Sequence, residues 1–359
     1  MSSTSTIGYE NRKCNVTFSI VIPAYNCSHY IRDTVSSILK QSYQMFEILI
    51  VDDGSTDDTL STCRSIERLD SRIKVFSKKN GGPFSARLYA YDYMKGDYVL
   101  HLDSDDMLRT DALEVLSVLI GKHIPDVVLF EKTTSKEFKR TEKLLPFESG
   151  RYFTDCDKTR LLNLALDTYA LNFISTKAVK ATILRNLCFP DEMMHLIVGE
   201  DLVQSLYVLQ AANDAVYTSE PLYFYRLNEE GTTRTYRKSD YSDALVCTSL
   251  IRRLVSDWQN LPGCTLTLEG CQKYFLIRTY RVIQGAWESG SADDRKTVLN
   301  SIIREGSVAH CYSNSAVSRS LRIDMRFVFQ AISNNHLRVA WSEMCIFELI
   351  RKLKKSLKI

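Results

Sequence analysis

The first hundred residues alternate between short apolar runs and segments of helical periodicity. The apolar runs lie at residues 17–26, 46–51, 73–77 and 98–102. Near-continuous runs of this length are typical of strands buried on both faces of a sheet. Between them, segments such as 28–41 and 84–94 place apolar residues three and four positions apart, as amphipathic helices do. This alternation predicts βαβ units and a largely parallel sheet with helices on both faces.

The middle of the chain continues this pattern less regularly. An apolar strand is expected at 126–130, a charged loop or hairpin at 131–142, and a helix-rich region at 159–187. A helix is expected from Glu200 to about Ala212. Two short strands, at 215–216 and 222–225, are expected after it.

Beyond about Lys238 glycine and proline become sparse and the periodicity is helical, for example over 319–332. We therefore expect a polar tail over residues 1–16, an α/β domain over 17–238 and a helical domain over 239–359. The boundary is expected near residues 237–241.

Composition narrows the class of protein. The chain has 359 residues, of which 25% are charged and 45% hydrophobic, which excludes collagen-like, low-complexity and globally disordered chains. Lys and Arg number 46 against 43 Asp and Glu, a net charge of +3. This balance argues against a chain dedicated to binding nucleic acid.

The cysteines and the N-terminus bear on location. None of the ten cysteines has C-x-x-C spacing, so neither a zinc ribbon nor a redox dithiol is indicated, and we expect reduced thiols in a cytoplasmic protein. Residues 1–16 contain no apolar signal-peptide core. The sequence also lacks an uncharged apolar stretch of about 18 residues, so no membrane-spanning helix is expected.

Polar side chains directly follow the predicted strands. They are Asn26, Asp52, Asp53, Asp103 and Asp105. In an open α/β sheet the carboxyl ends of the strands line the ligand crevice. These residues are therefore expected to share one edge of the sheet.

Two carboxylates two residues apart, Asp103 and Asp105, can share one hard divalent cation that bridges a diphosphate, for which Mg²⁺ or Mn²⁺ is suited. The alternative for this pair is a solvated turn. Asp53 can accept hydrogen bonds from a base N–H or a ribose hydroxyl, or it can form an Asx-turn or helix cap.

Three further positions have a chemical and a structural interpretation. Asp201, beside Glu200 at a helix start, can act as a general base, or both can simply favour the helix N-terminus. Arg226 and Thr232 can hold phosphate, or belong to a surface loop. No G-x-x-x-x-G-K-[ST], G-x-G-x-x-G or G-x-S-x-G motif occurs, which weakens kinase, ATPase, dinucleotide-binding and hydrolase hypotheses.

The chain ends in a basic amphipathic segment. As a helix it places Ile346, Leu349, Ile350, Leu353 and Leu357 on one face, and basic residues, among them Arg351, Lys352, Lys354, Lys355 and Lys358, around the rest. This pattern favours an anionic membrane surface. The alternatives are a solvated helix packed on its own domain and an interface between copies of the chain.

Six motifs occur in a fixed order over residues 18–234. They are Ile22-Pro-Ala-Tyr-Asn26, Val51-Asp-Asp-Gly-Ser-Thr56, Asn80-Gly-Gly with Ala86-Arg87, Asp103-Ser-Asp-Asp106, Gly199-Glu-Asp201, and Tyr225-Arg226 leading to Thr232. In this combination the chain resembles the inverting family-2 glycosyltransferases. The resemblance implies a GT-A fold, with a Rossmann-like, mostly parallel sheet flanked by helices. It does not extend to the C-terminal helical region.

The resemblance also implies a role for each matched residue. Pro23, Ala24 and Tyr25 would flank the nucleotide, Asp53 would bind uracil or ribose, Asn80 the nucleotide or sugar, and Asp103 ribose or sugar hydroxyls. Asp105 would hold Mn²⁺ or Mg²⁺, Asp201 would be the catalytic base with Glu200 beside it, and Arg226 and Thr232 would steady the diphosphate. The chain departs from the family where Leu88, not the frequent Asn, follows Arg87.

The implied function is transfer of a sugar from a UDP-sugar to a hydroxyl of a glycan or lipid-linked oligosaccharide in cell-surface polysaccharide synthesis. The expected location is cytoplasmic, on the inner face of the membrane. One alternative is a non-catalytic protein of this fold that binds a nucleotide-sugar or acts as a scaffold. Another is a D-x-D phosphatase, but here the motif follows the fourth predicted strand and lacks the Thr or Val that such enzymes carry.

Overall fold

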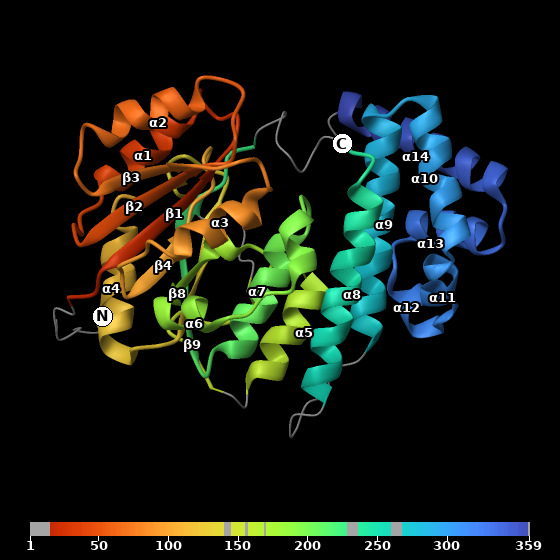
Figure 1. Cartoon of the computed structure of the whole chain (residues 1–359). Helices are drawn as coiled ribbons and strands as arrows, with labels where there is room; N and C mark the ends of the chain where they lie inside the picture. The colour runs from red at the N-terminus through yellow and green to blue at the C-terminus, as the bar shows by residue number, and fades with distance from the viewer. Residues whose placement is uncertain are drawn as a thin grey trace. The chain divides into compact units, whose positions relative to one another are not determined.

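A computed structural model describes residues 15–139, 145–154, 157–168, 170–227, 236–259 and 268–357 (Figure 1). The chain divides into two compact units, each built from separate stretches of sequence. Unit 1 comprises Met1–Asp155, Phe173–Cys188 and Gln210–Arg226; unit 2 comprises Cys156–Asn172, Phe189–Leu209 and Leu227–Ile359. The last crossing between the units falls at Arg226 and Leu227. The division into functional domains near residues 237–241 stays a prediction.

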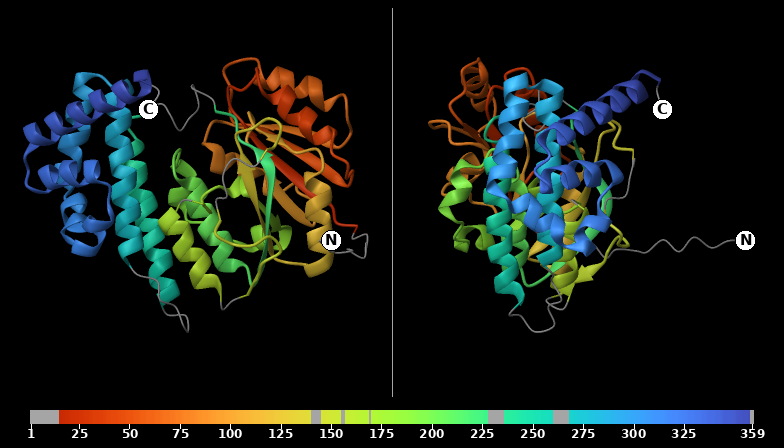
Figure 2. Two further views of the ribbon diagram at one scale, coloured as in Figure 1. Left: turned by 180° about the vertical axis from the view of Figure 1, so that it is seen from behind. Right: turned by 90° about the vertical axis from the view of Figure 1, so that its right-hand side faces the viewer.

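Unit 1 is a mixed, mostly parallel sheet covered by helices, as the α/β pattern predicts (Figures 1 and 2). The strand order is β3-β2-β1-β4-β8-β6-β9-β5, and β7 pairs with β9. The strands are β1 Phe18–Ala24, β2 Phe46–Asp52, β3 Ile73–Ser77, β4 Tyr98–His101, β5 Met107–Leu108, β6 Val127–Thr133, β7 Tyr152–Phe153, β8 Lys177–Lys180 and β9 Ala215–Phe224. The helices are α1 Ile31–Leu39, α2 Thr59–Glu67, α3 Pro83–Tyr91, α4 Ala112–His123 and α6 Ala181–Asn186.

The strand order fixes where a ligand can bind. From β1 the chain builds β2 and β3 on one side, and then places β4 on the other side of β1, parallel to it. This reversal is a topological switch point, and in open α/β sheets ligands bind beyond the strand ends at such a point. The residues that follow β1 and β4 lie at this point.

Three expectations about the middle of the chain were wrong, and buried polar residues account for two of them. β8 was missed because its first residue is Lys177, which is fully buried and donates from Nζ to the Phe173 carbonyl at 2.7 Å. β6 continues through Glu131, expected in a loop, because the Tyr217 hydroxyl donates to its buried carboxylate at 2.5 Å. The two short strands expected over 215–225 are one strand, β9.

Unit 2 is helical, as expected. It contains α5 Lys158–Thr168, α7 Glu200–Ala211, α8 Asp240–Gln259, α9 Leu268–Ser289, α10 Ala292–Glu305, α11 Ser307–Ser313, α12 Ser315–Ser320, α13 Ile323–Ser333 and α14 Leu337–Leu357. The single helix expected over 319–332 is two helices, because Leu321 and Arg322 have extended backbone between α12 and α13. Apolar side chains of α9 to α14 form the core of this unit.

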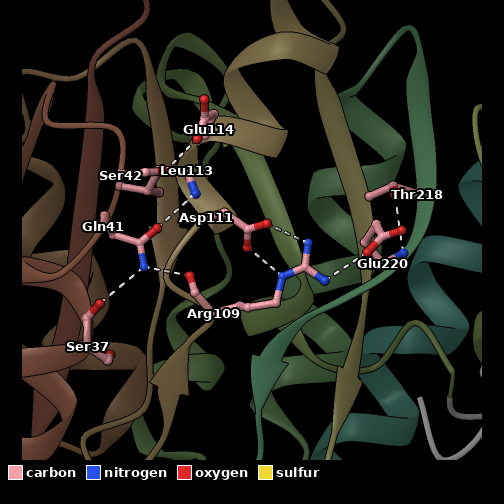
Figure 3. A network of polar contacts seen from close by, with 9 residues as sticks. All are labelled: Ser37, Gln41, Ser42, Arg109, Asp111, Leu113, Glu114, Thr218 and Glu220. Carbon is pink, nitrogen blue, oxygen red and sulfur yellow. Dashed lines mark hydrogen bonds and ion pairs between the residues drawn. The ribbon is translucent and has the colours of Figure 1, made fainter. Parts of the chain in front are cut away.

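A buried amide supports the turn that follows β5 (Figure 3). The side chain of Gln41 is 2% exposed; it donates to the carbonyls of Ser37 and Arg109 and accepts from the Leu113 N–H at 3.0 Å. Leu113 lies in the first turn of α4, whose N-cap side chain makes no capping bond. Gln41 therefore satisfies one of the N–H groups that a helix start leaves without an intrahelical partner.

Replacing Gln41 with Leu is expected to lower the free energy of unfolding by about 1–3 kcal/mol, because buried partners lose their hydrogen bonds. Urea denaturation followed by circular dichroism measures this. The matched control is Ser42→Ala, which removes an exposed hydroxyl bonded to Glu114 and should change stability by less than about 0.5 kcal/mol. Equal effects of the two substitutions would contradict the assignment.

Candidate functional site

Asp53, directly after β2, organises the loop that follows β3. Its carboxylate is buried and accepts from the backbone N–H of Gly81 at 3.0 Å and of Gly82 at 2.7 Å. It also forms an ion pair with Lys78 at 2.6 Å. Asp53 thus joins the ends of two neighbouring strands, and its role toward a base or ribose stays a prediction.

The end of β1 contacts the residues that directly follow β2. The carbonyl of Ala24 accepts from the Asp53 N–H at 2.8 Å, while the Tyr25 ring is exposed. Asn26 adopts a left-handed backbone, with φ of 47°, and its Oδ1 accepts from the Thr56 N–H at 2.8 Å. Pro23 is partly buried. An exposed aromatic ring at the switch point is a suitable platform for a nucleobase.

Asn80 is exposed beside the turn after β2. Gly54 in that turn has φ of +73°, and a Cβ at this position would lie 2.8 Å from the Asn80 backbone nitrogen. A side chain at residue 54 would therefore displace the loop that carries Asn80. The glycine of the Val51–Thr56 motif has a packing reason as well as a conformational one.

The 103–106 loop follows β4 on the other side of the switch point. Asp103 is partly exposed, and its carboxylate lies 3.4 Å from the guanidinium of Arg87 and 3.4 Å from the Tyr223 hydroxyl. Arg87 comes from α3 and is almost fully buried. The structure thus gives Arg87, a residue of the third motif, a contact with the first aspartate of the D-x-D pair.

Asp106 is the residue of this loop whose importance the sequence did not reveal. It is buried, and its two carboxylate oxygens accept from the Tyr223 hydroxyl at 2.5 Å and from the Arg226 N–H at 2.7 Å. Burial and the nearby Asp103 and Asp105 raise the pKa of Asp106 to about 8. The fourth position of Asp-Ser-Asp-Asp was the available signal, but spacing alone does not separate a ligand from an anchor.

Arg226 lies against the loop that carries Asp105. Its Nε donates to the Asp105 carbonyl at 2.6 Å, its guanidinium is 5.1 Å from the centroid of the Tyr30 ring, and Asp33 is 3.8 Å away. Two predicted site residues, 121 positions apart in sequence, are therefore neighbours. Thr232, predicted to act with Arg226, lies outside the described residues.

The oxygen donors at this loop suit a metal that is shared with a ligand. Among the residues that the structure describes, no group of three or more His, Cys, Asp or Glu side chains is arranged to hold an ion by itself. Mg²⁺, however, commonly takes one or two protein carboxylates and completes its shell with phosphate oxygens and water. Asp103 and Asp105, two partly exposed carboxylates two residues apart, are a fitting donor set for such a cation.

Glu200 and Asp201 begin α7, as expected, and they belong to unit 2. The preceding Gly199 has φ of +93°, and a Cβ there would meet the Cys247 Sγ at 2.8 Å. Residues of α8 hold this turn: Asp243 accepts from the Ile197 N–H at 3.2 Å. Glu200 is buried and Asp201 partly exposed at the positive end of the helix.

The predicted site is thus divided between the units. Asp53, Asp103, Asp105 and Arg226 belong to unit 1, whereas Glu200 and Asp201 belong to unit 2. That they meet in one pocket stays a prediction.

His101, the last residue of β4, is a buried titratable group next to the 103–106 loop. Its Nε2 lies 2.7 Å from the Tyr91 hydroxyl. Burial, with the positive charges of Arg87 and Lys177 nearby, holds the pKa of His101 well below its usual value near 6.5. In the unfolded chain the ring takes up a proton below about pH 6.5, whereas in the folded protein it stays neutral.

Stability should therefore fall as the pH drops below 6.5, because only the unfolded state binds this proton. We expect the wild type to lose about 1–2 kcal/mol more than His101→Gln between pH 7 and pH 5. Urea denaturation at the two pH values measures the difference. The control is His336→Gln, an exposed position that should leave the pH dependence unchanged. A His101→Gln slope equal to that of the wild type would exclude this source.

Comparison with known proteins relates this geometry to a family. The model of "Glycosyl transferase family 2" matches residues 19–182. Glycosyltransferase GlyA of Streptococcus pneumoniae serotype 4 is 28% identical over 228 residues, covering 61% of this chain and 32% of GlyA. Chondroitin synthase of Pasteurella multocida is 45% identical over 97 residues, which is 27% of this chain and 10% of the synthase.

A third relative has a solved structure. Poly(ribitol-phosphate) β-N-acetylglucosaminyltransferase TarS of Staphylococcus aureus is 29% identical over 219 residues, 60% of this chain and 36% of TarS. The crystal structure of TarS residues 1–349 with UDP-GlcNAc superposes with a TM-score of 0.64 at 20% identity, covering 93% of this chain and 92% of that one. This likeness concerns the fold. The chain spans about a third of the length of GlyA and TarS.

Proposed function

The chain contains a domain of glycosyltransferase family 2 with the GT-A fold, and from this premise we propose that it transfers a sugar from a UDP-sugar to a hydroxyl of a glycan or lipid-linked acceptor. The observation that carries the proposal is Arg226 bonded to the backbone of Asp105 at the switch point of the sheet. A cation beside a D-x-D loop suits a diphosphate leaving group. Because the chain matches the glycosyltransferase family, we do not retain the alternative of a D-x-D phosphatase.

The residues of unit 1 would bind the donor. Tyr25 and Asp53 would contact uracil and ribose, Asn80 and Asp103 the sugar or ribose hydroxyls, and Pro23 and Ala24 the flank of the nucleotide. Asp105 would hold Mn²⁺ or Mg²⁺. When bound, that ion neutralises the charge that develops on the departing diphosphate. Arg226, with Thr232, would stabilise the same group through charge-assisted hydrogen bonds.

The choice of donor is supported by the similar TarS structure, which contains UDP-GlcNAc. The names of the relatives support the proposed class of acceptor. TarS is named as an enzyme of poly(ribitol-phosphate), and the Pasteurella protein as a synthase of chondroitin, so a polymer of the cell surface is the acceptor class that we propose. Growing polymers of this kind are made at membranes, and we propose a cytoplasmic location on the inner membrane face. Among the described residues no helix is long and apolar enough to span a bilayer.

Asp201 is the proposed general base, and Glu200 lies beside it at the start of α7. Asp201 would accept the proton of the acceptor hydroxyl while the oxygen attacks the anomeric carbon opposite the departing UDP. One in-line displacement of this kind inverts the anomeric configuration. It needs no covalent intermediate on the protein.

A UDP-release assay over a panel of UDP-sugars with Mn²⁺ or Mg²⁺ tests this function. We expect release with at least one donor, and Asp201→Asn should retain donor binding and lose transfer by at least about 10²-fold, the usual contribution of a general base. Asp191→Asn, an exposed acid of the same unit, is the control. Full transfer by Asp201→Asn would refute the base; binding of donors without any release would favour the non-catalytic alternative.

Asp106 is expected to affect donor binding through the position of Arg226. In Asp106→Ala the Arg226 backbone loses its acceptor, and the affinity for UDP in the presence of Mn²⁺ should fall by about tenfold, the cost of roughly one hydrogen bond. Isothermal titration with UDP on the folded variant measures this. Tyr223→Phe, which removes one of the two bonds, should have a smaller effect.

The control is Asp111→Ala, because Asp111 pairs with Arg109 after β5 and lies outside the proposed donor site. It should leave UDP affinity unchanged. Wild-type affinity in a folded Asp106→Ala variant would show that the tether does not position Arg226.

A further inference from the structure

Large apolar side chains of α13 and α14 are turned to solvent. On α13, Ile323 is 68% and Phe327 53% exposed; on α14, Ile346 is 52%, Leu349 60% and Ile350 43% exposed. We refer to these five residues as the α13–α14 apolar face. The two helices pack against each other, and the Phe327 ring lies 6.5 Å from that of Phe347 on α14. Helical spacing places 323 with 327, and 346 with 350, on one side of each helix.

The side of α14 opposite the apolar face packs on its own unit, first through apolar residues and then through an ion pair. Its inward seam begins with the buried Ala340 and Met344 and continues into Glu348, which is also buried. Glu348 pairs with Arg351 at 2.7 Å, and Arg351 contacts Glu288 on α9. The Arg351 ion pair thus attaches the second half of α14 to α9, while Ile346, Leu349 and Ile350 face outward. The helix packs on its own unit, against α9 and α13, as one of the alternatives expects, but Ile346, Leu349 and Ile350 stay exposed.

Positive charge is concentrated in the same part of the chain. Residues 315–359 contain nine Lys or Arg and three Asp or Glu, a net charge of +6, whereas the whole chain carries +3. Arg322, directly before α13, and Lys352, on α14, are 66% and 70% exposed, although Arg322 pairs with Asp324 and Lys352 lies 3.8 Å from Glu348. The net charge of +6 already counts these acids. An apolar patch within a positive field is the pattern of an interfacial membrane helix.

We infer that the α13–α14 apolar face docks on an anionic lipid bilayer, with its apolar side chains inserted at the level of the headgroups and its basic side chains among the phosphates. Each basic residue near such a surface contributes about 1 kcal/mol, in addition to the apolar burial. A second copy of the chain is a poorer occupant, because it would bring two strongly positive surfaces together. The inference rests on the proposed function for its purpose, access to membrane-bound acceptors, but the binding itself does not require catalysis.

Sedimentation of the full chain with vesicles tests the inference. We expect it to bind vesicles of equal parts phosphatidylcholine and phosphatidylglycerol, and not vesicles of phosphatidylcholine alone. Replacing Ile346, Leu349 and Ile350 together with Ser should weaken binding by at least about tenfold, because each exposed side chain contributes apolar area on insertion. The control is Leu69→Ser, equally apolar and 76% exposed but in unit 1, which should bind like the wild type.

A charge variant separates the two contributions. Arg322→Gln with Lys352→Gln should weaken binding to the anionic vesicles by about tenfold, and raised salt should do the same. Absence of binding by the wild type, or full binding by the triple Ser variant, would overturn the inference. So would a dimer that the triple variant dissociates, measured by light scattering.

Measuring UDP release with a soluble acceptor distinguishes a failure of the docking inference from a failure of the proposed function. The triple Ser variant should release UDP at the wild-type rate, since the face contains none of the proposed site residues. If the wild type releases UDP normally but does not bind vesicles, only the docking inference is rejected. Vesicle binding without UDP release from any donor would reject only the enzymatic proposal.

Discussion

The contact between the 103–106 loop and the end of β9 is the constraint that fixes the position of the proposed donor residues Asp105 and Arg226. Asp106 accepts hydrogen bonds from Tyr223 and from the Arg226 backbone, and the Arg226 side chain returns a bond to Asp105. Three carboxylates within four residues repel one another. The buried Asp106 fixes the loop to β9, whereas Asp103 and Asp105, the proposed ligand residues, are partly exposed.

On the other side of the switch point, too, buried polar residues hold the loops and exposed residues lie beside them. Asp53 is buried and holds the loop after β3, while Tyr25 and Asn80 near it are exposed. Gln41 plays the corresponding part behind β5, where it closes the start of α4. Buried polar groups with all their bonds made give a rigid scaffold, because breaking any one of them leaves an unsatisfied group. The exposed residues then need little further ordering to bind.

Unit 2 supplies a different kind of element. Gly199 allows the tight turn before α7, so that Asp201 stands at the positive end of a helix that α8 fixes through Asp243. At the other end of the unit, α14 is held by ion pairs and keeps Leu349 exposed. The proposed transfer of a sugar to a polymer needs a base on one side of the sugar and the acceptor brought close to it. The helical unit contains candidates for both tasks.

The sequence determined the alternating strands and helices of unit 1, the polar residues at the strand ends and the family motifs, because apolar periodicity and turn chemistry are local properties. It did not reveal β8, whose first residue is the buried charged side chain of Lys177, or the length of β6, where the partner of Glu131 lies 86 residues away. Tertiary structure alone decided that Asp106 is an anchor, and that Leu349 faces outward while Glu348 faces inward. The physical reason is that a side chain's role depends on which hydrogen-bond and packing partners the fold brings to it, and the partners of Glu131 and Asp106 lie 86 or more residues away along the chain.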